Sequence, residues 1–283
     1  MESSVSADGK APLDVFRIEP ESGLSRLGLR EVWRYRDLLV FLTWRDILIR
    51  YKQAVLGVAW AVLQPFLTMV VFTVVFSGAL NVKTGSIPYP VFTFSALLPW
   101  QLFAGAIQRS GQSLVGNANL LTKVYFPRLV IPLSAVAGGL IDFALGLVVL
   151  FGLMAYYHVT PTWSVVLLPV FVIFAMLAAL SVSLWLSALN VLYRDVQYIL
   201  PFLIQLWMFI TPVMYPLAPK NPVAKIVVGL NPMTGVVDGF RWALAGGDPP
   251  KHLIWVSAVV VAVILTTGLY YFRYMERIFA DVV

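Results

Sequence analysis

The sequence predicts an all-α membrane protein that crosses the bilayer several times. Of its 283 residues, 60% are hydrophobic and 12% are charged, whereas soluble domains are about 45–50% apolar and about 25% charged. Long runs without Asp, Glu, Lys or Arg recur along the chain, and roughly 20 apolar residues form a helix that crosses the hydrocarbon core. This composition excludes a soluble enzyme and a disordered chain.

The residues before the first span divide into two parts. Residues 1–22 are polar and lack an apolar core, so they are expected to form a flexible cytoplasmic tail rather than a signal peptide. Residues 23–53 mix Leu, Trp and Tyr with Arg, which is typical of an amphipathic helix in the membrane interface. An i,i+4 pair of Asp46 and Arg50 supports this helix. A soluble helix packed on a partner is the alternative.

Six stretches are long and apolar enough to be transmembrane helices, with boundaries accurate to a few residues. The predicted spans are residues 56–80, 90–110, 129–157, 164–190, 196–216 and 253–272, within a transmembrane domain of residues 54–283. The third span contains Asp142, and a carboxylate at that depth must be neutral, paired or in contact with water. A hydrogen bond to a neighbouring helix is the favoured interpretation of Asp142, and a proton or ion site is the alternative.

Basic residues predict the orientation of the chain. Most of the 20 Lys and Arg residues fall before the first span, after the second and fourth spans, or after the sixth. Because cytoplasmic segments carry an excess of Lys and Arg, both termini are expected in the cytoplasm. Arg109 is counted with the cytoplasmic segments, and Arg241 with the outer ones. The net charge of +6 is therefore attributed to topology and not to nucleic-acid binding.

The segment before the last span does not fit the pattern. Residues 220–246 are too polar to span the membrane and too apolar for an ordinary loop. Pro222 and the pair Asn231-Pro232 are turn or helix-start signals. Two short helices that enter the outer leaflet and return are expected, with their backbone covered by protein. A plain extracellular loop is the alternative.

Two predicted spans carry polar and aromatic side chains along one helical face. The stripe on the first span consists of Gln53, Gly57, Trp60, Gln64 and Thr68. The stripe on the fifth span includes Gln197, Gln205 and Met208. Such stripes suit a conduit, and aromatic faces beside amide groups suit sugar rings, but hydrogen bonds between packed helices produce the same spacing.

The sequence carries none of the common motifs for covalent chemistry. It has no Walker A pattern, no zinc-ligand spacing of its two histidines and no nucleophile elbow. It also has no cysteine, which excludes disulfides and thiolate metal sites. We therefore expect no enzyme, and assign no catalytic, cofactor-binding or metal-binding residue.

The order of several short motifs resembles the membrane subunits of ABC exporters for polysaccharides, the permeases for lipid-linked O-antigen, capsule and teichoic-acid chains. The resemblance extends from Trp44 to the end of the chain. Its motifs are Trp44-Arg45-Asp46-Ile47, Arg50-Tyr51-Lys52, Leu56-Gly57, Trp60, Gln64-Pro65, Leu98-Pro99-Trp100, Asn119-Leu120-Leu121, Lys123-Val124-Tyr125-Phe126-Pro127-Arg128, Asn190-Val191-Leu192-Tyr193-Arg194-Asp195, Thr211-Pro212-Val213-Met214-Tyr215 and Asn231-Pro232-Met233.

The resemblance implies a homodimer whose pore lies at the interface and is lined by the first and fifth spans. It also implies two separate ATP-binding subunits, which would hold ATP and Mg²⁺ themselves. The residues implied to contact these ATPases are Leu121, Lys123, Tyr125, Phe126, Arg128, Tyr193, Arg194 and Asp195. In this interpretation Tyr125 and Phe126 are anchors in a groove, and Lys123 and Arg128 meet its acidic rim.

The N-terminal interfacial helix resembles an element that guides a lipid pyrophosphate to the gate, and the implied residues are Arg45, Arg50 and Lys52. The expected function is export of an undecaprenyl-pyrophosphate-linked polysaccharide across the bacterial inner membrane, with O-antigen as the favoured polysaccharide. One alternative is a same-fold ABC exporter of teichoic acid, capsule, a drug or a lipid. A membrane-embedded glycosyl- or acyltransferase and a proton-coupled transporter are alternatives of other classes.

Overall fold

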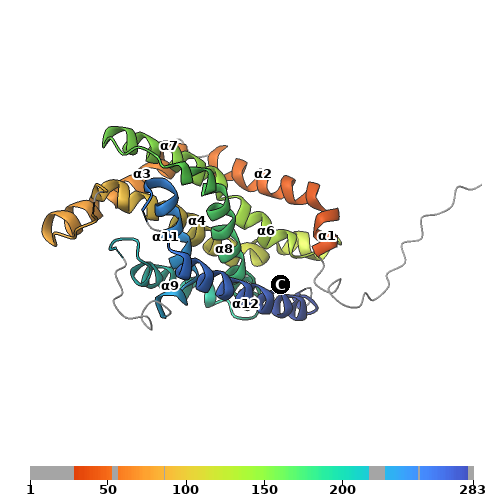
Figure 1. Cartoon of the computed structure of the whole chain (residues 1–283). Coiled ribbons are helices and arrows are strands. Elements are labelled where there is room, and N and C mark those ends of the chain that lie inside the picture. Colours follow the sequence, from red (N-terminus) through yellow and green to blue (C-terminus); the bar gives the residue numbers. More distant parts are fainter. Residues whose placement is uncertain (1–28, 53–56, 86, 217–226, 248, 280–283) are drawn as a thin grey trace, which may run out of the picture.

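The computed structural model describes residues 29–52, 57–85, 87–216, 227–247 and 249–279, and these residues form helices joined by turns (Figure 1). Five helical stretches are long and apolar enough to cross a membrane: Ala59–Ala79, Tyr89–Gly116, Val130–Tyr156, Trp163–Leu192 and His252–Glu276. The prediction of an all-α, multi-pass membrane protein is therefore confirmed.

The predicted fifth span is shorter than expected, so the count of six spans is not confirmed. Helix α9 (Val196–Ile210) has 15 residues, whereas the prediction extended to residue 216. It ends because Thr211 is in an extended conformation, which the following Pro212 favours, and because Pro212 has no N–H to continue the helix.

Helix α4 (Tyr89–Gly116) lies at the centre of the bundle. It packs against α8 (Leu168–Leu192), which begins after a short 3-10 turn at Trp163–Leu167, and against the broken third span described below. Small residues such as Ala175, Ala178 and Ser181 of α8 are fully buried and let the two backbones approach closely. The Asn190 amide also donates a hydrogen bond to the Gly111 carbonyl, 2.9 Å away.

The third predicted span is not one continuous helix. Helix α6 (Val130–Ala137) and helix α7 (Leu140–Tyr156) are separated by a turn at Gly138 and Gly139. The first span also changes geometry, because helix α3 (Gly57–Phe72) continues into a π-helical segment at Thr73–Ala79. The turn between α6 and α7 lies at a glycine pair, which is a recognised cause of breaks in transmembrane helices.

The predicted interfacial segment forms two helices, α1 (Leu29–Arg34) and α2 (Arg36–Lys52). Helix α2 packs on α6, and Leu42 and Ile47 are buried. Phe41 and Trp44 remain exposed on the other side of the helix. A location in the membrane interface stays a prediction, and residues 1–28 and 53 lie outside the described part of the chain.

Residues 232–245 form a helix and not a plain loop. Helix α11 (Pro232–Ala245) begins after Asn231, whose side chain accepts a hydrogen bond from the Met233 amide. It packs on α4, α8 and α12 (Lys251–Glu276). Residues 227–229 are also helical, and the rest of the first predicted re-entrant helix lies outside the described residues. At the opposite end of the bundle, α1 lies beside the end of α12, where Arg273 is 3.4 Å from Glu31 (Figure 1).

Candidate functional site

A cleft of about 940 Å³ opens between α3, α4, α7 and α9. Its walls combine apolar residues with amide, hydroxyl and aromatic side chains. The polar and aromatic lining residues are Arg50, Trp60, Gln64, Thr68, Trp100, Gln101, Gln108, Arg109, Asp142, Phe143 and Gln205. Polar side chains are unusual in spans of this hydrophobicity, so their collection in one cleft makes it the candidate functional site.

The two predicted stripes meet in this cleft. Trp60, Gln64 and Thr68 enter it from α3, and Gln205 and Met208 enter it from α9. Of the remaining members, Gly57 is the first residue of α3, Gln53 lies outside the described residues, and Gln197 is half-buried and does not line the cleft. That these residues line a transport path stays a prediction.

Trp100 forms the floor of the cleft on the α4 side, and two further aromatic residues pack behind it. Trp100 lines the cleft and is 5.4 Å from Phe103 between ring centroids, and Phe103 packs edge-on against Trp207 at 5.1 Å. The Trp207 indole N–H donates to the Asn231 side-chain oxygen at 3.0 Å. Through this hydrogen bond the floor is connected to the N-terminus of α11.

One end of the cleft is charged. Arg50 of α2 donates from Nη1 to Oδ2 of Asp142, 2.5 Å away, and the Tyr51 hydroxyl donates to the other oxygen of the same carboxylate. Burial raises the pKa of Tyr51 to about 12, and the hydrogen bond to Asp142 acts in the same direction, so the phenol stays protonated and remains a donor. Asp142, which was predicted to be neutral, paired or in contact with water, is thus paired with Arg50 and Tyr51 of α2.

Arg109, which was counted with the cytoplasmic segments because of its charge, lies on the last two turns of α4. It is part of α4, which continues to Gly116, so Arg109 lies about 10 Å before the helix end at 1.5 Å per residue. Its Nε donates to the Ala135 carbonyl at 3.2 Å. Among the described residues its buried Nη2 has no hydrogen-bond partner.

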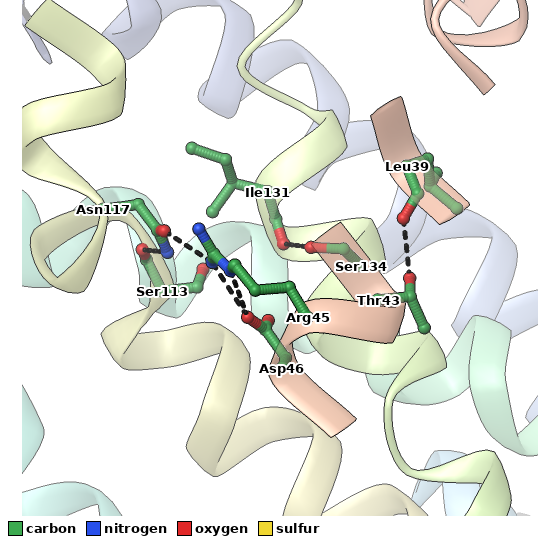
Figure 2. Close-up of polar contacts among 8 residues, drawn as sticks. All are labelled: Leu39, Thr43, Arg45, Asp46, Ser113, Asn117, Ile131 and Ser134. Atoms are coloured by element: carbon green, nitrogen blue, oxygen red, sulfur yellow. Dashed lines mark hydrogen bonds and ion pairs between the residues drawn. The ribbon is translucent and has the colours of Figure 1, made fainter. Parts of the chain in front are cut away.

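Arg45 joins α2 to the C-terminal end of α4 (Figure 2). Its Nη2 donates to the Asp46 carboxylate and to the Asn117 side-chain oxygen, both at 2.8 Å. The expected Asp46–Arg50 pair is therefore replaced, because Asp46 binds Arg45 and Arg50 reaches Asp142. Lys52, the third predicted gate residue, is exposed at the end of α2 and does not line the cleft.

The two aromatic residues of the predicted main coupling loop differ sharply. Tyr125 is 82% exposed, whereas Phe126 is 5% exposed and belongs to a core cluster with Leu121. The loop includes the short helix α5 (Ala118–Lys123), at whose end Lys123 is exposed. Phe126 thus differs from the expectation of a surface anchor, because its ring packs within the subunit.

The charged residues of the two predicted coupling segments also differ in exposure. Arg128 is half-buried and donates to the Glu276 carbonyl of α12, so it holds the loop to the last helix. Tyr193, Arg194 and Asp195 are all exposed between α8 and α9. Contact with an ATPase at either segment stays a prediction.

Arg241 is a structural residue that the sequence interpretation assigned to an outer loop. It is 8% exposed on α11 and donates to the carbonyls of Val213, at 2.7 Å, and Phe92, at 3.2 Å. Its guanidinium also lies 3.6 Å from the Phe92 ring centroid and 3.5 Å from Asp238. Arg241 thereby ties α11 to α4 and to the turn after α9.

These features define a multi-pass helical membrane protein with a polar cleft and no assigned catalytic centre. Residues 37–245 match the family model of the ABC-2 type transporter. Because this match covers most of the chain, the protein belongs to the ABC-2 type transporter family and is a membrane subunit of that transporter class.

Three named proteins are similar to this chain over most of its length. The O-antigen export system permease protein RfbA of Myxococcus xanthus is 35% identical over 240 residues, covering 82% of this chain and 92% of the relative. A protein of the same name from Klebsiella pneumoniae is 29% identical over 247 residues, with coverages of 87% and 95%. The polysialic acid transport protein KpsM of Escherichia coli is 25% identical over 250 residues, with coverages of 82% and 91%.

Proposed function

We propose that the chain is the permease subunit of an ATP-driven exporter that carries a lipid-linked polysaccharide out of the cytoplasm across the bacterial inner membrane. O-antigen is the favoured polysaccharide. The observation that carries this proposal is the cleft, which is lined by the polar residues Gln64, Thr68 and Gln205 together with the aromatic residues Trp60 and Trp100. Amide groups suit sugar hydroxyls and flat rings suit the C–H faces of sugars. The names of the three relatives support the same substrate class.

A second copy of the chain would complete the conduit. Helices α3 and α9 frame the cleft, and both expose further apolar residues, including Leu63, Leu67, Phe202 and Leu206. Pairing two copies along these helices would enclose two clefts in one pore and would cover part of this surface. Export through such a pore requires alternation between closed and open interfaces.

Two separate ATPase subunits would supply the energy and would bind ATP and Mg²⁺. Tyr125 and Lys123 are available for contact on the first segment, and Tyr193, Arg194 and Asp195 on the second. The Arg45–Asn117 hydrogen bond gives a route from the first segment to α2, because Asn117 lies at the junction of α4 and α5. A push on α5 would therefore be transmitted to the helix that carries Arg50.

The proposed orientation places both termini in the cytoplasm. Helix α1 and the end of α12 lie at the same end of the bundle, which supports placing both termini on one side of the membrane. Arg45, Arg50 and Lys52 would then lie on the side from which a lipid-linked pyrophosphate arrives.

Purification from native membranes with reconstitution tests the proposal. The chain should be recovered with an equal amount of a Walker-motif ATPase, and vesicles containing both should move an undecaprenyl-linked glycan in the presence of ATP. The class of glycan that accumulates in the cytoplasm of a deletion strain separates O-antigen from capsule and teichoic acid. Recovery of the chain alone in several mild detergents, together with normal surface glycan in the deletion strain, would contradict the proposal.

A further inference from the structure

The segment that connects α5 to α6 is held by the end of the last helix. The Arg128 side chain donates to the backbone carbonyl of Glu276, and the Arg128 backbone N–H donates to Oε1 of the same residue at 3.3 Å. The Arg128 guanidinium also lies 6.0 Å from the ring centroid of Phe279. These contacts join positions that are 148 residues apart in the sequence, so they fix the segment against a distant part of the chain.

Arg128 and Glu276 each meet a helix end of suitable polarity. Arg128 lies two residues before α6, and the Glu276 carboxylate is placed at this N-terminal end, where free N–H groups and the helix dipole favour a negative charge. Glu276 is the last residue of α12, where unpaired carbonyls favour a cation, and the Arg128 guanidinium supplies it. The two helix ends therefore stabilise the same pair of residues.

A second arginine fixes the Glu276 carboxylate. Arg273 donates from Nη1 to Oε2 of Glu276 at 2.7 Å, and its Nη2 lies 3.4 Å from Oε2 of Glu31 on α1. The side chains of Arg273 and Glu276 are 22% and 16% exposed, so solvent screens their attraction only in part. Both oxygens of Glu276 thus have donors. Arg128, Arg273 and Glu276 are called the Glu276 clamp below.

The Glu276 clamp lies close in the chain to Tyr125, the exposed residue of the predicted main coupling loop. Phe126 is buried in a core cluster that also contains Met275 of α12, and Pro127 restricts the backbone because its ring fixes φ. Tyr125 is therefore followed directly by anchored residues, although its own side chain is 82% exposed. A side chain on a fixed backbone loses less conformational entropy when a partner binds it.

We propose that Glu276 is a positioning residue for the ATPase contact, because it holds the backbone on which Tyr125 is presented to the ATPase. This inference rests on the proposed function, which places an ATPase at this segment. Arg128, which was expected to meet an acidic rim of the ATPase, belongs to the clamp instead, since its guanidinium is bound within the subunit. Glu276 acts through Tyr125 and does not itself touch the ATPase.

A double-mutant cycle on ATPase binding tests this inference. The full-length chain in lipid nanodiscs is titrated with the full-length partner ATPase, and the dissociation constant is measured. Glu276→Ala should weaken binding by about tenfold, and adding it to Tyr125→Ala should weaken binding little further, because the position of an absent ring no longer matters. Glu276→Gln should bind more tightly than Glu276→Ala, since its amide oxygen still accepts from the Arg128 N–H.

Two controls separate positioning from a loss of stability. Arg194→Ala alters the second predicted ATPase segment, and its effect should add to that of Glu276→Ala. Arg277→Gln, at an exposed position next to Glu276, should leave binding unchanged. A merely structural role would lower the thermal midpoint and the fraction of folded protein, without coupling to Tyr125 in the dissociation constant. If Glu276→Ala does not fold, the same cycle with Glu276→Gln decides.

Failure of the inference is distinguishable from failure of the proposed function. Additive effects of Glu276→Ala and Tyr125→Ala, unchanged affinity in Tyr125→Ala, or equal coupling of Glu276 to Arg194 would overturn the positioning role, while the wild-type complex still assembles and exports glycan. A wild-type chain that binds no ATPase and exports no glycan would contradict both.

Discussion

Helices α4 and α3 are both apolar enough to span the membrane, yet protein covers them very differently. In α4, 78% of an apolar 18-residue stretch is buried within the subunit. The corresponding share is 11% in the first span, which contains α3. The buried helix carries small residues such as Ala106 and Gly111 between large ones such as Phe94 and Phe103, whereas bulky residues of the uncovered helix such as Val71 stay exposed. Apolar surface gains nothing by leaving lipid, so close approach of backbones decides which helix is central.

This contrast separates two roles within one bundle. Helix α4 is the scaffold against which α7, α8 and α11 pack, and it contributes the aromatic floor of the cleft. Helix α3 has one polar face on the cleft and leaves its remaining surface to lipid or to a second copy. Substitutions in the scaffold should therefore change stability, and substitutions on α3 should change transport.

The largest effect is expected where the scaffold is held by a buried charge. Arg241→Met removes the donor for two carbonyls and leaves Asp238 without its cation. Breaking such a buried pair costs about 3–5 kcal/mol, so the thermal midpoint of the detergent-solubilised protein should fall steeply. Arg36→Met is the control, because Arg36 is exposed. Equal midpoints for the two variants would show that Arg241 does not hold α11 in place.

A smaller effect is expected at the predicted coupling loop, where two adjacent aromatic residues differ in exposure. Tyr125→Ala should leave the subunit stable and weaken ATPase binding by about 2–4 kcal/mol, the range of an interface anchor. Phe126→Leu should instead lower subunit stability. Pull-down of the ATPase and thermal unfolding measure the two quantities. Stable subunits with full ATPase recovery from Tyr125→Ala would exclude Tyr125 as an anchor.

The packing of α7 on α4 gives the next effect. Gly146→Ala would push a methyl group into Leu98 of α4, at a cost of about 1–3 kcal/mol for overpacking. Gly152→Ala on the same helix meets nothing within 4 Å and should stabilise by up to about 1 kcal/mol through helix propensity. Thermal unfolding of both variants compares them directly, and a loss of stability in Gly152→Ala alone would contradict this packing.

The smallest effect is expected on α3 and should appear in transport. The double substitution Gln64→Leu and Thr68→Val removes polar groups from the cleft, and each lost hydrogen bond to a glycan costs about 0.5–1.5 kcal/mol. Export in reconstituted vesicles should slow several-fold without a change in the thermal midpoint. Val70→Ile is the matched change on the face of α3 that is turned away from the cleft, and it should leave export unchanged.

Local sequence patterns predicted those features that depend on helical spacing. The polar stripe on the first span has the correct phase, since Trp60, Gln64 and Thr68 line one cleft, and Asn231-Pro232 marks the start of α11. The fifth span was predicted too long, although Thr211-Pro212 is a visible stop signal. That signal was outweighed by the hydrophobicity of the residues around it.

The features that sequence reasoning missed depend on contacts between distant segments. Charged residues were used to assign segments to one side of the membrane, so Arg109 and Arg241 were not recognised as residues whose side chains bind backbone carbonyls within the helical bundle. The Arg50–Asp142 pair joins residues 92 positions apart, and no local pattern indicates it. Burial of Phe126 likewise depends on a core cluster that includes residues of α6, α8 and α12, which the loop sequence does not reveal.

The central claim is that the cleft beside α3 is the water-accessible path of the exporter, and cysteine labelling tests it most directly. The chain contains no cysteine, so single substitutions have no background. In the reconstituted complex, Gln64→Cys should react with a membrane-impermeant maleimide and should be protected by bound lipid-linked glycan. Val70→Cys, on the face of α3 that is turned away from Gln64 and does not line the cleft, should not react. Equal labelling at both positions, or labelling of Val70→Cys alone, would contradict the account.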